Sequence, residues 1–214
     1  MTAVPPKRFR LKAKLQPTQA RAQDTYEVIL ATAGEMLRDR GFEQLTTNAI
    51  CQRAGLTPPA LYRYFPNKYA ILKELGDRLM AAQDEEMIGW IESGGLAGAT
   101  FDERLASIVA IQTRMAEIIR AFPGGIAIGR ALRAVPMLQK LRFASRDMVA
   151  TELAAAIGPL YPRVDGSRLA VATRMLVELS YAATEMMVEE PDRDVDRLAV
   201  EVCRMFVLYF DDLG

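Results

Sequence analysis

Apolar residues recur every three or four positions along nearly the whole chain of 214 residues. This spacing is typical of amphipathic α-helices, whereas half-buried strands require strict alternation over several residues. The stripe that runs from Thr18 to Arg40 is followed by Gly41, a residue type that often terminates helices. Because no segment alternates for long enough to need a strand, the sequence predicts an all-α fold with about nine helices.

Glycine and proline clusters divide the rest of the chain into further helices. Ser93-Gly94-Gly95 and Gly158-Pro159 are two such breaks. We expect the remaining helices at about residues 46–53, 57–65, 68–92, 101–121, a short piece ending at 134, 136–157, 166–190 and 192–211.

The charged residues are distributed unevenly, although 27 Lys and Arg balance 27 Asp and Glu. Residues 1–72 hold eleven basic and five acidic groups, and residues 73–214 hold sixteen and twenty-two. The first third is therefore the candidate to bind a polyanion. Its first 17 residues are expected to form a flexible basic arm, which is either a solvated tail or a segment that reaches the phosphates or the minor groove of DNA. The cations of this arm are Lys7, Arg8, Arg10, Lys12 and Lys14.

The residue types that are missing exclude several classes of site. The chain contains no histidine, so it has no Ser-His-Asp triad and no imidazole ligand or proton shuttle. Its two cysteines, Cys51 and Cys203, are too far apart in sequence for a zinc-ribbon pattern or a disulfide framework. We expect no metal and no cofactor. The sequence shows neither a signal peptide nor a membrane span, and it predicts a protein of the cytoplasm.

Residues 46–65 predict two short helices joined by a tight turn. Thr46 can cap the first, Gly55 allows the sharp turn, and Leu56 fills the angle between the helices. The second helix begins with Pro58-Pro59, which is tolerated because the first amides of a helix have no internal acceptor. This is a helix-turn-helix arrangement, whose second helix enters the major groove.

Residues 18–72 resemble the tetracycline-repressor (TetR) family of bacterial transcription regulators. The resemblance rests on Gly41-Phe42, Thr46-Thr47, Ile50, Arg53-Ala54-Gly55, Leu56-Thr57, Leu61-Tyr62, Tyr64-Phe65, Lys68 and Leu72. It implies a three-helix DNA-binding domain over residues 18–72 and a larger helical domain over residues 73–214. The sequence departs from the family pattern at Cys51, where alanine is usual, and at Tyr69, where glutamate is common. The implied function is a repressor that binds a palindromic operator as a homodimer and is released by a small apolar molecule.

The candidate DNA contacts lie in and around the two short helices. The resemblance assigns phosphate contacts to Thr47, Tyr62 and Lys68, while Tyr64 and Phe65 belong to the core. Thr57 is expected to cap the second helix through a hydroxyl that accepts from Ala60. Arg63 is either a solvated residue or the bidentate partner of a guanine. The full set is Thr47, Thr57, Pro58, Pro59, Ala60, Tyr62, Arg63 and Lys68.

The larger domain is expected to hold the dimer interface and the effector pocket. Two apolar stripes on the last two helices suit a four-helix interface or, alternatively, an internal core. The stripes are Leu169, Ala172, Leu176, Leu179, Ala183 and Met186, and Val195, Leu198, Val202, Phe206 and Tyr209. Methionine and aromatic residues are candidates for the pocket, although core packing explains them equally well. They are Met87, Trp90, Met115, Phe122, Phe143, Met148 and Met175.

Two other classes of protein remain as alternatives. A small helical enzyme would need a catalytic motif, and neither GxSxG nor a Gly-rich phosphate loop is present. A protein-interaction module without DNA binding would be favoured if DNA fragments failed to bind at low salt. We therefore expect a DNA-binding regulator and not an enzyme.

Overall fold

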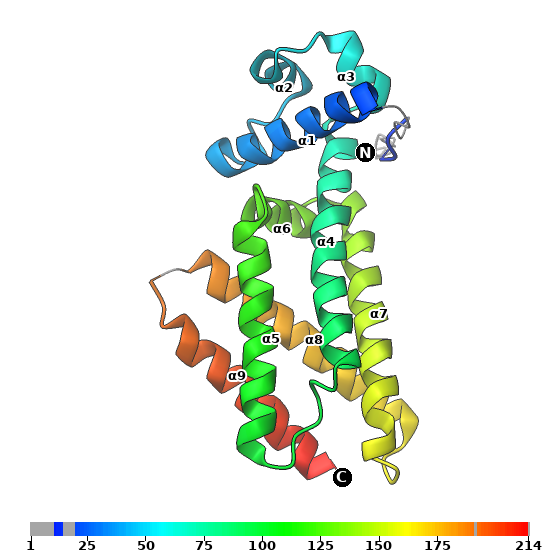
Figure 1. Ribbon diagram of the computed structural model, residues 1–214, viewed down its shortest axis with the longest axis vertical. Coiled ribbons are helices and arrows are strands. Elements are labelled where there is room, and N and C mark those ends of the chain that lie inside the picture. The colour runs from blue at the N-terminus through cyan, green and yellow to red at the C-terminus, as the bar shows by residue number, and fades with distance from the viewer. Residues whose placement is uncertain (1–10, 15–19, 191, 214) are drawn as a thin grey trace, which may run out of the picture. The chain divides into compact units, whose positions relative to one another are not determined.

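The computed structural model describes residues 11–14, 20–190 and 192–213, and within them it contains helices and no strand (Figure 1). The all-α prediction is confirmed, and the nine α-helices found in these residues match the number expected. They are α1 (Ala20–Arg40), α2 (Thr47–Ala54), α3 (Pro58–Tyr64), α4 (Lys68–Glu92), α5 (Phe101–Ala121), α6 (Gly125–Ala134), α7 (Gln139–Ile157), α8 (Gly166–Glu189) and α9 (Val195–Leu213).

Local capping sets most of the helix ends. Thr46 accepts a hydrogen bond from the amide of Ala49 at the start of α2, and Gly55 ends that helix with φ of 66°. Two ends differ from the prediction. Pro136–Leu138 form a 3₁₀ turn before α7. The last helix starts at Val195 because the Asp194 carboxylate accepts from the Arg197 amide and so terminates the helix there.

The chain divides into two compact units. The N-terminal unit comprises Met1–Arg78 and Pro123–Leu138, and the C-terminal unit comprises Leu79–Phe122 and Gln139–Gly214. The sequence-based domain limit lies at residue 72, and that division places 123–138 in the larger domain. In the structure α6 packs against α1 and is grouped with the helix-turn-helix segment.

The core of the N-terminal unit is aromatic and aliphatic. Tyr26 of α1 stacks on Phe65 with ring centroids 4.8 Å apart and meets Tyr64 edge-on at 5.9 Å. Tyr64 and Phe65 are both buried, as predicted. Ile50 of α2 and Leu61 of α3 are also buried, so both short helices are fixed by their apolar faces against this core.

Two glycines allow α6 to approach α1 closely. A Cβ atom on Gly124 would lie 2.5 Å from the carbonyl oxygen of Gly34, and a Cβ on Gly34 would lie 2.8 Å from that of Pro123. Gly124 also has φ of 74°, which side-chain-bearing residues rarely adopt. This turn therefore requires glycine at both positions.

The C-terminal unit is built around α8, which packs against α5, α7 and α9. The α5 helix also packs against α9, and their ends are joined by Arg104, whose guanidinium lies 2.7 Å from the Asp211 carboxylate. Thr100 and Glu103 form a capping box at the start of α5. No helix of the described chain is long and apolar enough to cross a membrane.

Candidate nucleic-acid interface and ligand cavity

The two short helices present one exposed face. Leu61 and Tyr64 of α3 are buried, whereas Pro58, Pro59 and Arg63 are exposed. The half-buried Ala60 lies beside them. The structure therefore brings the residues predicted to read bases to the outer face of α3.

Thr57 is the residue that precedes α3, but its hydroxyl does not cap the helix. The amide of Ala60 donates to the Thr57 backbone carbonyl at 3.0 Å, and the side chain makes no cap hydrogen bond. The predicted side-chain cap is wrong because the carbonyl of the same residue takes the amide. The Thr57 hydroxyl remains on the exposed surface.

The three residues predicted to contact phosphate are each held by a neighbour. The Tyr62 hydroxyl lies 3.0 Å from Thr47 Oγ1, so a hydrogen bond joins α3 to the first residue of α2. Tyr62 itself is 39% exposed. At the start of α4, the Lys68 ammonium lies over the Phe42 ring, 4.2 Å from its centroid. Sequence reasoning assigned no such role to Phe42.

Lys14, in the described part of the basic arm, is hydrogen-bonded to the backbone of α3. The Lys14 amide donates to the Tyr64 carbonyl at 2.6 Å, and its ammonium donates to the Tyr62 carbonyl at 3.0 Å. Both Lys12 and Lys14 are exposed, whereas Lys7, Arg8 and Arg10 lie outside the described residues. This attachment places at least one cation of the arm next to Tyr62.

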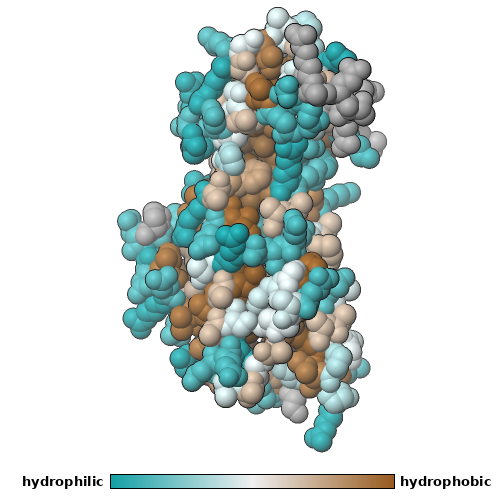
Figure 2. Space-filling view, viewed as in Figure 1, coloured by the Kyte–Doolittle hydropathy of each residue, from teal (hydrophilic) through white to brown (hydrophobic). Residues whose placement is uncertain are grey.

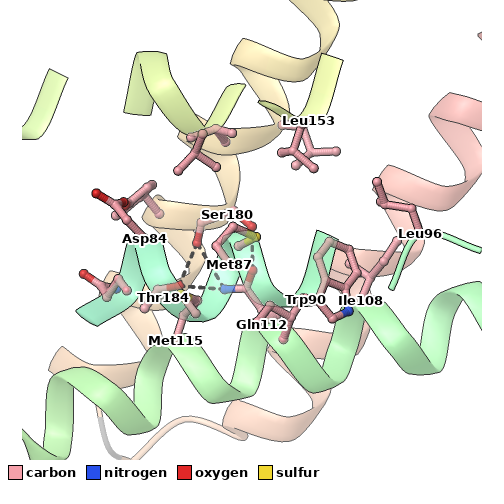
Figure 3. A pocket seen from close by; sticks show the side chains of 16 residues that line it. Asp84, Met87, Trp90, Leu96, Ile108, Gln112, Met115, Leu153, Ser180 and Thr184 are labelled. Atoms are coloured by element: carbon pink, nitrogen blue, oxygen red, sulfur yellow. Dashed lines mark hydrogen bonds between the residues drawn. The ribbon is translucent and has the colours of Figure 1, made fainter. Parts of the chain in front are cut away.

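A cavity of about 60 Å³ lies inside the C-terminal unit, with walls from α4, α5, α7 and α8 (Figure 3). Of the predicted pocket residues, Met87, Trp90 and Met115 line it, and Phe122, Phe143, Met148 and Met175 do not. Phe143, Met148 and Met175 are exposed, because they lie on the outer faces of α7 and α8. Phe122 ends α5 and is grouped with the C-terminal unit away from the cavity wall.

Sequence reasoning missed the polar residues of the cavity wall. They are Gln83, Asp84, Gln112, Ser180, Tyr181 and Thr184. Gln112 joins α5 to α8, since its Nε2 donates to Thr184 Oγ1 at 2.7 Å and its Oε1 accepts from Ser180 at 2.6 Å. Burial raises the pKa of the Asp84 carboxyl, and the Ser145 hydroxyl that donates to it at 2.7 Å lowers that pKa by a smaller amount.

Residues 29–75 match the family model of the bacterial regulatory proteins of the tetR family. This N-terminal part of the chain is therefore similar to the DNA-binding part of the TetR family. The chain is 43% identical over 54 residues to the class C tetracycline repressor of Escherichia coli, an alignment that covers 25% of each protein. The chain thus spans about a quarter of the length of that curated relative, and the match lies in the helix-turn-helix part of the TetR family.

Solved TetR-family and related structures share the fold of the remaining chain. A regulator from Pseudomonas aeruginosa PAO1 has a TM-score of 0.67 with 16% identity, covering 91% of this chain and 93% of that one. SmeT, solved as a complex with triclosan, has a TM-score of 0.64 with 20% identity, covering 87% and 91%. At these identities the likeness establishes the fold alone.

The last two helices of the chain carry an exposed apolar face, but it is not the pair of predicted stripes. From those stripes, residues such as Ala172, Val202 and Phe206 are buried inside the unit, and Leu179, Met186 and Tyr209 are exposed. The exposed face consists of Val171, Met175, Leu179 and Met186 on α8 and Met205, Leu208 and Tyr209 on α9. In the view of Figure 2, brown apolar side chains reach the surface where α8 ends and α9 begins.

The two cysteine thiols of the chain are sequestered. Cys51 and Cys203 are buried, and burial raises the pKa of both thiols, that of Cys203 to about 12. Among the described residues, no group of three or more Cys, Asp and Glu side chains is placed to hold a metal ion.

Proposed function

We propose that this chain is a transcriptional repressor that binds a palindromic operator through α3 as a homodimer and is released by a small molecule. The observation that carries the proposal is the exposed face of α3, where Tyr62 is hydrogen-bonded to Thr47 and its carbonyl accepts from the Lys14 ammonium. Homology to the class C tetracycline repressor over this same segment supports it. The relatives are named as repressors and regulators, which favours regulation over catalysis.

The residues of this surface divide into two roles. Thr47, Thr57, Tyr62 and Lys68 supply hydroxyl groups and a cation for phosphate oxygens, contacts that fix register and affinity. Base reading falls to the exposed leading residues of α3. There Arg63 suits the O6 and N7 acceptors of guanine, and the apolar surface of Pro58, Pro59 and Ala60 suits thymine methyl groups.

The homodimer would use the exposed apolar face of α8 and α9. Seven large apolar side chains exposed on two adjacent helices are more than scattered surface residues, and such patches mark protein interfaces. A twofold dimer presents two copies of α3, and operators of such dimers have half-sites about one helical turn apart. The small-molecule effector would occupy the cavity that Trp90 and Gln112 line, as triclosan occupies a site in its complex with the similarly folded SmeT.

Selection of bound fragments from genomic DNA by the purified protein tests the proposal, followed by affinity measurements against salt concentration. Lys68→Ala should lower affinity for operator and unrelated DNA alike and reduce the slope of log K against log salt by about one. Tyr62→Phe should also weaken binding to both kinds of DNA, by up to about tenfold.

Lys140→Ala is the matched control, because Lys140 is an exposed lysine of α7 in the other unit. It should leave the salt slope unchanged. Absence of fragment enrichment at low salt would reject DNA binding, and unchanged affinity in both Lys68→Ala and Tyr62→Phe would reject the contact assignment.

A further inference from the structure

The polar part of the cavity wall has most of its donors already engaged. Gln112 Nε2 donates to Thr184 Oγ1 and to the Ser180 carbonyl, at 2.7 and 3.1 Å. The Ser180 hydroxyl donates to Gln112 Oε1, and Trp90 Nε1 donates to Ser107 Oγ at 3.1 Å. A ligand that offers acceptors finds these donors taken.

Two acceptors of the same wall remain available. Gln83 is 2% exposed, and its Oε1 atom has no hydrogen-bond partner in the described part of the chain. Leaving a buried acceptor unsatisfied costs free energy that a donor entering the cavity would recover. Next to it in sequence, Asp84 accepts one hydrogen bond, from Ser145, and pairs with no Lys or Arg among the described residues.

Two arginines of this region, Arg146 and Arg174, are paired with carboxylates other than Asp84. Arg146 forms ion pairs with Glu178 and with Glu185, the latter at 3.6 Å, and its guanidinium lies over the Tyr181 ring. Arg174 pairs with Asp147 at 2.9 Å and with Glu178 at 2.6 Å. These two cations thus face three carboxylates without Asp84, so the negative charge of Asp84 is left for a cation from outside.

One end of the cavity is polar and the opposite end is apolar. Asp84 lies at one end in Figure 3, and Leu96, Ile108 and Leu153 lie toward the opposite end. These three residues also line a second cavity of about 80 Å³ in the same unit. Trp90 lies near Ile108 at this apolar end in Figure 3.

We propose that the effector is an amphipathic amine, with its ammonium group bonded to Asp84 and Gln83 Oε1 and its hydrocarbon chain directed toward Leu96. This inference rests on the proposed function for the identity of the site as an effector site. The sequence predicts an apolar effector, and the present proposal adds one cationic end to that apolar molecule. The cavity is smaller than the ~300 Å³ of typical ligand pockets, so flexible side chains such as Met87 and Met115 move aside on binding.

Three probes of equal chain length test the proposal: n-decylamine, n-decanol and decanoate. Trp90 is the single tryptophan of the protein and lines the cavity, so its fluorescence reports occupancy directly. The amine should bind about tenfold to a hundredfold more tightly than the alcohol, and decanoate should bind most weakly. Equal affinities for amine and alcohol, or no fluorescence response to any probe, would overturn the proposal.

The Asp84→Asn variant removes the charge and keeps an oxygen that can accept from Ser145. It should reduce amine affinity to about that of the alcohol, and decanol binding should change little. The matched control is Glu85→Gln, which removes a charge from the exposed neighbouring residue of α4 and should leave amine affinity unchanged. An unchanged preference for amine in Asp84→Asn would reject the role of this carboxylate. The titrations contain no DNA, so a failure of DNA binding would leave their result standing.

Discussion

Two buried glutamines of the cavity wall differ in whether their side-chain oxygen is hydrogen-bonded. Gln83 and Gln112 are each 2% exposed, yet Gln112 is bonded at both ends of its amide, whereas Gln83 Oε1 is unpaired. The same substitution should therefore change the free energy of unfolding in opposite directions at the two positions. The contrast separates a residue that stabilises the unit from one available to a ligand.

Replacement of each glutamine by methionine makes this testable. Gln83→Met should raise the free energy of unfolding by about 1 kcal/mol, because an unsatisfied buried group is lost, and should weaken binding of decylamine. Gln112→Met should lower the free energy of unfolding by about 1–3 kcal/mol, since Ser180 and Thr184 lose their partner. Urea denaturation without ligand measures both. A loss of stability in Gln83→Met would contradict the assignment of its Oε1 as unsatisfied.

The sequence correctly predicts those residue positions whose exposure depends on the local pattern alone. The 3.6-residue period and the Pro58-Pro59 start are enough to predict which side of α3 is exposed. The cavity is different, because its polar wall joins α4, α5 and α8, and the pairing of these helices is not encoded in any one segment. Phe143 and Met148 illustrate the limit, since apolar residues on an outer helix face resemble core residues in sequence.

At the scale of elements, α6 is the feature that sequence reasoning did not place. The sequence predicts a short helix that ends at residue 134, and α6 occupies Gly125–Ala134, but the pattern does not show what this helix packs against. The tight approach of Gly124 to Gly34 depends on residues about 90 positions apart and on a helix-helix contact. Helix ends could be predicted from capping and break residues, but this packing partner could not.

Gly124→Ala tests the packing of α6 on α1. The added Cβ would meet backbone at 2.5 Å and force a residue other than glycine into positive φ, so we expect a loss of about 2 kcal/mol or more in unfolding free energy. The control is Gly129→Ala in the same helix, where a Cβ meets nothing within 4 Å. Gly129→Ala should raise the free energy of unfolding by up to about 1 kcal/mol, because alanine has a higher helix propensity than glycine. Equal effects of the two substitutions in thermal denaturation would refute the close approach.

For the whole molecule, the apolar face of α8 and α9 is the surface that the proposed homodimer would use. Leu208 is 54% exposed within it, and Leu160 is similarly exposed outside it at 62%. Leu208→Glu should convert the proposed homodimer into monomer in sedimentation experiments and weaken the proposed operator binding, because burying a charge in an interface is costly. Leu160→Glu should leave the dimer intact. A dimer that persists in Leu208→Glu would place the interface elsewhere.

The unsatisfied oxygen of Gln83 also has an evolutionary consequence. Substitutions that remove a local cost at a binding site can increase thermal stability while function is lost. Laboratory selection of this protein for heat resistance alone is therefore expected to accumulate apolar residues at position 83. Under the proposed function, such variants would still bind DNA but would no longer respond to the amine, and selection for that response would restore the glutamine.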